Sequence, residues 1–499
     1  MRKILPIFCL MMVVPFAFSF AQTDEWMTDY VTLDDGANAT GDQVSSVGVI
    51  GPDRFVALVT ETPVDITPAN LFNPPGCYLV GYWDADSVNG IVPSPINGSQ
   101  TTPDYGGTGK FSDWEYILDK VTLNGAWAIA ADTDGFIYVA NNDVVHNILV
   151  FELTADGLVS SPYRMETGSE NIYALEVDTA GYVYVVDYEG TEGKTDELKV
   201  FAGIDAPNTT WGDFPGHNDS PVTTIDLPAG IYQGVTVSGD GTALYISASS
   251  ERSVLKYVGD PQTGYTLDEK FSFALAEDDT VANGGNGTPT VLGLAYMDEP
   301  PLVYAVADTF LGIGASGGYP YGRIYVLDPQ WGTVNDTIDI AEWNLLISGA
   351  YDTGSSNGRV GGYTSVTDVD VEPEENGVYT QTYYGWAVEK WVFDGDLNDI
   401  VNSVEKITSG TPERFELRQN YPNPFNPNTT IEFELTRNDF VTLEIYNALG
   451  QKVAALLSGM MTPGAYKVEF DAGKLPTGIY FYQLTAGNMK SVRKMILAK

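Results

Sequence analysis

Residues 172–187 read Ile-Tyr-Ala-Leu-Glu-Val-Asp-Thr-Ala-Gly-Tyr-Val-Tyr-Val-Val-Asp, and residues 126–140 read Ala-Trp-Ala-Ile-Ala-Ala-Asp-Thr-Asp-Gly-Phe-Ile-Tyr-Val-Ala. Each stretch is an apolar run, an Asp-x-x-Gly turn and a second apolar run rich in Tyr and Val. In such a turn Asp favours the first position, and Gly accepts the positive φ that closes it. The pattern therefore predicts a β-hairpin that occurs at least twice.

The same hairpin recurs along the chain. A third clear copy covers residues 232–247, and weaker copies cover 292–308, 364–382 and 44–60. Most copies are followed by one or two further short strands, so each unit holds about four strands. Regular four-stranded units predict a β-propeller of six blades, or of seven if the long interval between residues 44 and 126 holds another. The last unit lacks a fourth strand after Phe393, and we expect residues 26–33 to supply it and close the ring.

The hairpin sequence also carries a resemblance. Asp132–Asn141 and Asp178–Asp187 resemble the propeller superfamily whose blades carry Asp-x-x-Gly-x-Ile-Tyr-Val-Ala-Asp, which includes sugar-lactone hydrolases and many proteins that only bind. The resemblance implies a central channel in which carboxylate and Asn side chains from different blades can hold a divalent ion. The candidates for that role are Asn141, Asp187 and Asp308, with Glu176 or Asp368 beside them.

A second acidic stretch has the spacing of a calcium loop. Asp394, Asp396, Asn398 and Glu405 stand at positions 1, 3, 5 and 12 of such a loop, although Asp399 stands where the turn requires Gly. The alternative is a solvated linker. Two His residues and a single Cys left after signal cleavage argue against a zinc or redox-metal centre, so Ca²⁺ is the metal to consider.

The N-terminus has the features of a secretory signal. Arg2 and Lys3 precede an apolar run over residues 4–20, and Ser19-Phe20-Ala21 offers small residues at the cleavage positions. We expect residues 1–21 to be removed. No second long apolar run follows, so we expect no transmembrane segment in the mature chain.

Charge is distributed unevenly. The chain has a net charge of −42; from Pro412 onward 10 Lys and Arg stand against 8 Asp and Glu, so this part is about +2 and the rest −44. An acidic body repels nucleic acid and anionic lipid, which excludes both as partners. A glycan or a protein remains as the expected ligand.

The C-terminal part differs in composition from the body. Residues 394–414 are polar and predict a linker, and three prolines within residues 422–427 predict an extended arm. Alternating strand patterns follow at 430–435, 441–446, 465–470, 478–484 and 490–497. Short antiparallel strands over residues 415–499 predict a small Ig-like β-sandwich.

Three blocks in this part, over residues 421–427, 445–451 and 475–480, and the closing residues 494–499 are similar to the type A C-terminal sorting domain of the type IX secretion system. The candidate sorting residues, called the two sorting blocks, are Tyr421, Pro422, Asn423, Pro424, Phe425, Asn426 and Pro427, followed later by Gly478, Ile479 and Tyr480. The resemblance implies passage across the outer membrane by the secretion machinery and removal of the tail between residues 400 and 415. The body is then either shed or attached to the cell surface.

Together these observations predict an all-β protein with a propeller over residues 22–393. We expect a secreted or cell-surface binding protein rather than an enzyme. The alternatives are a Ca²⁺-dependent hydrolase or lactonase that uses the channel, and a structural component of the envelope or matrix. Three ligands at about 2.3–2.6 Å from one point in the channel would favour the hydrolase.

Overall fold

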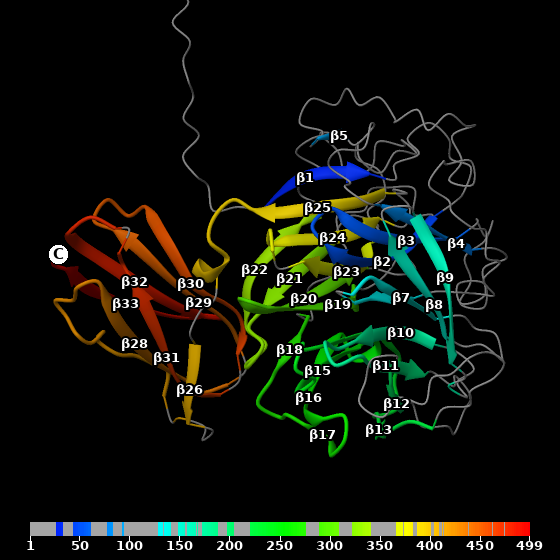
Figure 1. The fold of residues 1–499 in the computed structure, drawn as a ribbon. Helices are drawn as coiled ribbons and strands as arrows, with labels where there is room; N and C mark the ends of the chain where they lie inside the picture. Colours follow the sequence, from blue (N-terminus) through cyan, green and yellow to red (C-terminus); the bar gives the residue numbers. More distant parts are fainter. Residues whose placement is uncertain are drawn as a thin grey trace, which may run out of the picture.

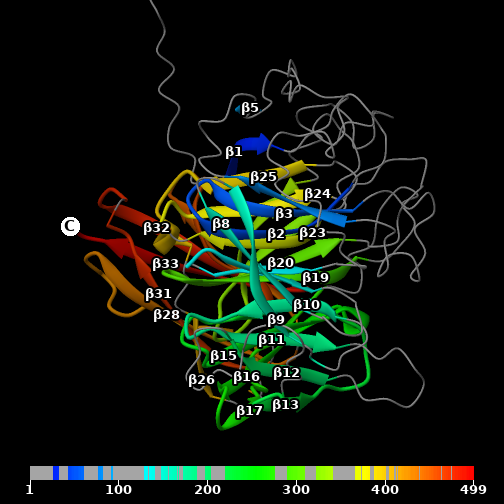
Figure 2. The same cartoon turned by 45° about the vertical axis from the view of Figure 1, so that its right-hand side comes forward.

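The computed structural model is all-β, and the strands in the described part of the chain form eight antiparallel sheets (Figures 1 and 2). It describes residues 26–32, 43–60, 77–82, 92–93, 128–132, 134–140, 148–154, 157–165, 167, 172–187, 197–203, 220–275, 289–308, 322–340, 366–372, 374–382, 387–400, 404–408, 412, 414–437, 439–461, 463–473 and 475–499. The expected signal peptide, residues 1–21, lies outside this part of the chain. Within it, no helix has the length and apolar character needed to cross a membrane.

Six sheets form the body, and they coincide with the six repeats. The first is β2(Gln43–Gly51), β3(Arg54–Thr60) and β4(Cys77–Tyr82). The second is β6(Ile129–Ala131), β7(Phe136–Ala140), β8(Ile148–Thr154) and β9(Gly157–Met165), and the third is β10(Ile172–Val177), β11(Tyr182–Asp187), β12(Glu197–Ala202) and β13(Thr223–Asp226).

The other three body sheets follow the same order. The fourth is β14(Tyr232–Val237), β15(Ala243–Ala248), β16(Ser253–Asp260) and β17(Gly264–Leu267), with β18(Phe273–Ala274) beside β16 and the 3₁₀ turn η2(Ser249–Glu251) between β15 and β16. The fifth is β19(Thr290–Asp298), β20(Pro301–Asp308), β21(Arg323–Leu327) and β22(Val334–Asp339). The sixth is β23(Val366–Glu372), β24(Gly377–Thr382), β25(Ala387–Phe393), β1(Trp26–Thr32) and β5(Val92–Pro93).

The sixth sheet joins two distant parts of the sequence. β1 pairs antiparallel with β25, and Trp26 lies opposite Phe393. The Trp26 indole Nε1 also donates to Asp336 Oδ2 at 3.1 Å, and its ring packs edge-on against Tyr304. The prediction that residues 26–33 supply the outer strand after Phe393 is therefore confirmed.

The first strands of the six sheets contact one another in a closed order, β2, β6, β10, β14, β19, β23 and again β2. The sheets thus surround a common axis, which is a propeller-like arrangement (Figure 2). Neighbouring sheets share separate apolar clusters; for example, Tyr184 and Leu244 belong to the cluster between the third and fourth sheets. Each sheet is therefore held by the face of its neighbour, as expected for repeats that cannot bury their apolar faces alone.

The hairpin turns have the chemistry that the sequence predicts. The Asp178 carboxylate accepts from the backbone N–H groups of Ala180 and Tyr182 at 3.0 and 2.9 Å, and Gly181 has φ +78°. One aromatic ring per sheet follows at the matching position of the second strand, and all of these rings are fully buried: Phe55, Tyr138, Tyr184, Tyr245, Tyr304 and Tyr379.

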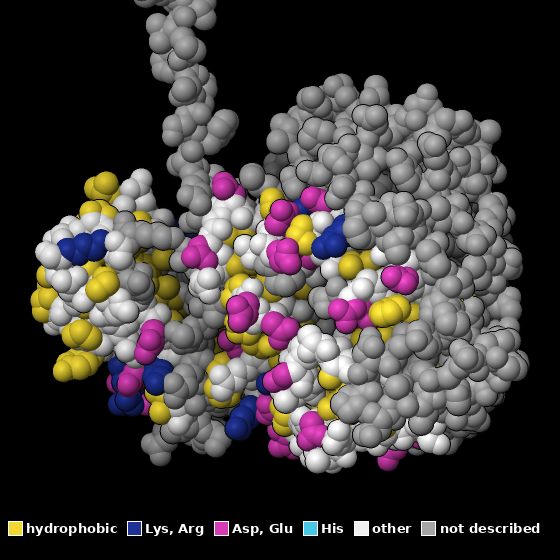
Figure 3. Space-filling view, viewed as in Figure 1, with side chains coloured by type: hydrophobic (Ala, Val, Ile, Leu, Met, Phe, Trp, Pro, Cys, Tyr) yellow, Lys and Arg dark blue, Asp and Glu magenta, His cyan; other side chains and the backbone are white. Residues whose placement is uncertain are grey.

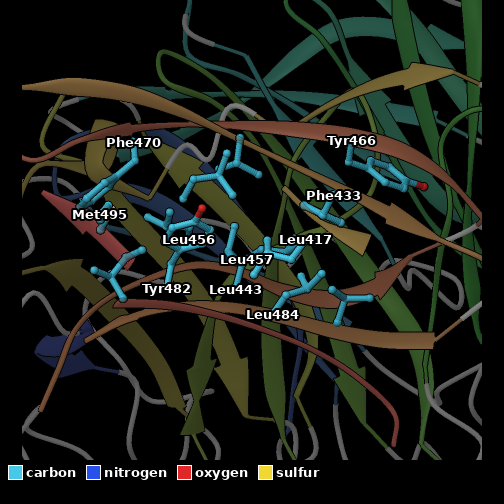
Figure 4. Close-up of a cluster of buried hydrophobic side chains, with 14 of the residues drawn as sticks. Leu417, Phe433, Leu443, Leu456, Leu457, Tyr466, Phe470, Tyr482, Leu484 and Met495 are labelled. Carbon is cyan, nitrogen blue, oxygen red and sulfur yellow. The ribbon is translucent and has the colours of Figure 1, made fainter. Parts of the chain in front are cut away.

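The C-terminal unit consists of two four-stranded sheets around one apolar core (Figure 4). One sheet has the order β26(Val404–Thr408), β31(Gly464–Asp471), β28(Asn428–Leu435) and β27(Glu416–Leu417), and the other has β30(Lys452–Met461), β29(Asp439–Asn447), β32(Gly478–Ala486) and β33(Met489–Leu497). The buried side chains come from both sheets, including Phe433 and Tyr466 on one side and Leu443 and Tyr482 on the other. β30 lies against β22 of the body (Figure 1).

The predicted linker 394–414 needs correction at both ends. Leu397 and Ile400, around the 3₁₀ turn η3(Leu397–Asp399), are buried in the core of the fifth and sixth sheets. Residues 404–408 form β26, which pairs with β31 and so belongs to the C-terminal unit. The polar composition concealed this strand, because β26 is an edge strand with Ile407 exposed.

Candidate functional site

A small acidic cavity, which we call the axial cavity, lies where the first strands of the six body sheets meet. It has a volume of about 40 Å³, and all six of those strands contribute to its walls. Three carboxylates line it, Glu176 from β10 and Asp368 and Asp370 from β23. Glu176 and Asp368 were candidates from the sequence, whereas Asp370 was missed, although its spacing of two residues from Asp368 on one strand places both on the same face.

Most of the carboxylate hydrogen bonds in the cavity tie strands together. Asp368 Oδ2 accepts from Ser46 Oγ and from the Val47 backbone N–H, and Ser46 Oγ in turn accepts from the Ile129 N–H at 3.2 Å. Asp370 Oδ2 accepts from the Val49 N–H at 2.6 Å. These bonds connect β23 to β2 and β2 to β6 at the axis of the ring.

The protein around these carboxylates disfavours their charged form. Burial raises the pKa of Asp368 to about 6, and burial together with the negative charge of Asp368 raises the pKa of Asp370 to about 7. Burial, and then repulsion from Asp370, raises the pKa of Glu176 well above its usual range. Because the three carboxylates repel one another, ionisation of one raises the pKa of its neighbours.

Of the three candidate channel ligands, only Asp308 has a described side chain. Asp308 is fully buried at the end of β20, where its Oδ2 accepts from the Val366 N–H at 2.9 Å, and it does not line the cavity. Asn141 lies outside the described residues. Asp187 is described only as the last residue of β11, opposite Ile172 and Glu197. Asp308 therefore ties the fifth sheet to the sixth.

The candidate calcium loop is divided between two units. Asp394 is half-buried after β25, and Asp396 Oδ1 accepts from both the backbone N–H and the Nδ2 of Asn398, so it caps η3. Glu405 belongs to β26 in the C-terminal unit, opposite Lys467. Among the described residues, no group of three His, Cys, Asp or Glu side chains is arranged to hold a metal ion.

A larger depression, which we call the rim depression, lies beside η3 at the rim of the fifth and sixth sheets. Its volume is about 370 Å³, and its walls combine carboxylate, amide and proline side chains: Glu299, Pro300, Pro301, Asn376, Asp396, Leu397 and Asn398. Pockets for small ligands have volumes of roughly 300–1,000 Å³, whereas the axial cavity has room only for a few waters. The rim depression is therefore large enough for a sugar ring.

The proline-rich arm of the C-terminal unit is fixed along the edge of β33. The Phe425 N–H donates to Ile496 O at 2.9 Å, and the Ala498 N–H donates to Phe425 O at 3.0 Å. Asn423 Oδ1 accepts from the Ile496 N–H, while its Nδ2 donates to Lys494 O. Because the arm occupies this edge, residues 494–498 are not open to pairing with another strand.

The two sorting blocks each divide into inward and outward side chains. Phe425 is buried in the core of the C-terminal unit, and Tyr480 is buried with its hydroxyl donating to Pro476 O at 2.7 Å. In contrast, the Tyr421 side chain is 81% exposed and Ile479 is 47% exposed. The inward residues therefore maintain the fold, and the outward residues are available for contact with another molecule.

Comparison with known proteins identifies the C-terminal unit. Residues 419–498 match the family model described as the secretion system C-terminal sorting domain. The match includes both sorting blocks. This sorting domain indicates that the chain is exported to the cell surface or secreted.

Solved structures resemble the chain at low sequence identity. No curated protein matches the chain. Among solved structures, PorZ, a surface component of the type IX secretion system of Porphyromonas gingivalis, is 12% identical with a TM-score of 0.35 over 91% of this chain and 51% of its own. This chain thus spans about half the length of PorZ.

A gluconolactonase from Xanthomonas campestris is 11% identical with a TM-score of 0.38, and the similarity covers 74% of this chain and 89% of that protein. Regucalcin from Agrobacterium tumefaciens is 10% identical with a TM-score of 0.37, and the similarity covers 71% of this chain and 85% of that protein. Similarities at this level assign no function to the body.

Proposed function

We propose that this protein is a secreted or cell-surface β-propeller that binds a glycan or a protein and is exported by an Ig-like sorting domain. The observation that carries the proposal is the match of residues 419–498 to the sorting-domain family. The closed order of contacts among the first strands supports six blades rather than seven, because β2 contacts β6 directly.

The rim depression is the proposed ligand site. Sugar rings are bound in proteins by amide and carboxylate groups together with flat apolar surfaces, and the walls of this depression offer Asn376, Asn398 and Glu299 beside Pro300 and Pro301. The axial cavity is too small for such a ligand, and its carboxylates bind backbone groups.

Export is tested by fractionation of cells that carry a type IX secretion system. The full chain and a chain that ends at Ile400 are expressed with the same N-terminal signal, and the protein is quantified in the medium, on the surface and in the periplasm. We expect the full chain outside the cell and the truncated chain in the periplasm. Equal export of both would overturn the proposed role of the tail.

Ligand binding is tested on a glycan array with the full chain. We expect Asn398→Ala and Glu299→Gln to weaken binding by about tenfold, which corresponds to about 1.4 kcal/mol. The control is Glu251→Gln, an exposed carboxylate in η2 far from the depression in sequence. Binding that is unaffected by the depression variants would place the ligand elsewhere. Calorimetry with Ca²⁺ on the same protein tests the metal-dependent alternative.

A further inference from the structure

The second sheet of the C-terminal unit presents an apolar face to solvent. Ile479, Phe481 and Val492 are 47%, 37% and 50% exposed, although large apolar side chains are normally buried. They belong to the neighbouring strands β32 and β33 (Figure 1). We call this surface, with Tyr446, Lys490, Lys494 and Ile496, the β32–β33 face.

Strand register places these side chains together. Ile479 lies opposite Ile496, Phe481 opposite Lys494, and Gln483 opposite Val492. Phe481 also lies opposite Tyr446 of β29 on its other side. Residues directly opposite one another in neighbouring strands share a face of the sheet, so the apolar residues are contiguous. The alternate residues Tyr480 and Tyr482 point into the core, which leaves the β32–β33 face free of a structural role.

Both edges of this sheet are engaged. The arm around Phe425 is hydrogen-bonded to β33, and β30 lies against β22 of the body. A partner that adds a strand would therefore have to displace one of these contacts. Recognition through side chains on the β32–β33 face requires no such change.

Charge favours a protein as the occupant. Lys490 and Lys494 are exposed beside the apolar residues, while Glu444 on β29 is paired with Lys452 at 3.3 Å and accepts from Tyr446 Oη at 2.6 Å. The face is thus cationic, whereas the rest of the chain is strongly acidic, and acidic side chains outnumber basic ones on the described surface of the body (Figure 3). An anionic membrane surface would repel that body, but a protein groove lined by carboxylates can select the tail alone.

We propose that the β32–β33 face is the surface by which the tail docks on a protein of the export machinery, one that offers an apolar groove bordered by acidic side chains. This inference rests on the proposed export function and identifies the part of the tail that performs recognition. Ile479 and Phe481 are the central contacts, and Lys490 and Lys494 select the acidic border. Buried aromatic and aliphatic anchors at the centre of an interface carry most of its binding energy.

The test compares export of full-chain variants in cells with a type IX secretion system. Ile479→Ser with Phe481→Ser, and separately Lys490→Glu with Lys494→Glu, are each expected to lower the exported fraction about tenfold, with the remainder in the periplasm. The matched control is Val222→Ser with Leu267→Ser, two apolar body residues of similar exposure at 44% and 47%. Thermal unfolding of each purified full chain separates loss of recognition from loss of folding. The Lys variants replace exposed side chains and therefore keep the test valid if the apolar variants unfold.

The outcomes distinguish this inference from the proposed function. If both pairs of variants are exported like the wild type while the chain that ends at Ile400 is retained, the docking face is elsewhere on the tail. If the truncated chain is itself exported, the export function fails first. Retention of the folded face variants with normal export of the control supports the inference.

Discussion

The carboxylates at the axis of the ring make stability depend on pH. Asp368 and Asp370 have pKa values of about 6 and 7 in the folded protein, against about 3.9 in an unfolded chain. The folded state therefore binds more protons between pH 4 and 7. By linkage, the stabilisation of the folded state by protonated Asp368 and Asp370 is fully present below pH 4 and is lost as the pH rises through 7.

Asp370→Asn tests this linkage at a single residue. The amide can still accept from the Val49 N–H but carries no charge at any pH. We expect the fall in Tm between pH 5 and pH 8 to be smaller in Asp370→Asn than in the wild type, as measured by calorimetry. The exposed Glu251→Gln variant is the control and should follow the wild type. An identical pH dependence in all three proteins would show that Asp370 is charged in the folded state.

The arm residues test the division between fold and recognition. Phe425 is 2% exposed in the core of the C-terminal unit, so Phe425→Ala should destabilise that unit by about 3–5 kcal/mol. Tyr421 is 81% exposed, so Tyr421→Ala should change its stability by no more than about 0.5 kcal/mol. Hydrogen exchange of the β28 and β31 amides measures both effects in the full chain. Equal protection in the two variants would contradict the observed packing of Phe425.

At the scale of elements, β1 is the strand that closes the ring. It covers the outer edge of β25 and carries Trp26 into the cluster shared by the fifth and sixth sheets. We expect a mature chain that begins at residue 34 to expose the β25 edge and to self-associate. Light scattering of the purified protein checks this, with the mature chain from residue 22 as reference. A monomeric, equally stable shortened chain would mean that β1 is not needed for closure.

The repeats made most of the body elements predictable. The six first strands begin close to the predicted positions 44, 126, 172, 232, 292 and 364, since a short acidic turn, Asp-x-x-Gly in the second and third sheets, closes each hairpin locally. β30 and β26 of the C-terminal unit were not predicted. In β30 the run Ala-Ala-Leu-Leu lacks the alternation of a strand, and β26 depends on pairing with the distant β31.

The candidate site was less predictable than the fold. The resemblance to the propeller superfamily places Asp308 at the position of a channel ligand. In the structure its carboxylate instead accepts from the backbone N–H of Val366 in the next sheet. A carboxylate that ties two sheets and one that binds a metal can have the same place in a repeat, because only the tertiary partner differs. The acidic stretch from Asp394 to Glu405 was predicted as one loop, but its two ends belong to different units, and only the tertiary pairing of β26 with β31 shows this.

At the scale of the whole molecule, a strongly acidic body is joined to a nearly neutral tail. The body carries almost all of the negative charge and holds the proposed ligand site, while the tail holds both sorting blocks and the β32–β33 face. The pairing of β26 with β31 sets the boundary between them close to residue 401. This boundary makes the tail a separable unit with its own core.

The most direct test of the account is transfer of that unit to another protein. Residues 401–499 are fused to a periplasmic reporter that has its own signal peptide, and the reporter is measured in the medium and on the surface of cells with a type IX secretion system. A second fusion with residues 415–499 lacks β26 and should be exported less. We predict that the 401–499 fusion leaves the periplasm. A folded reporter that stays in the periplasm with residues 401–499 attached would contradict the central claim that this unit is the export signal.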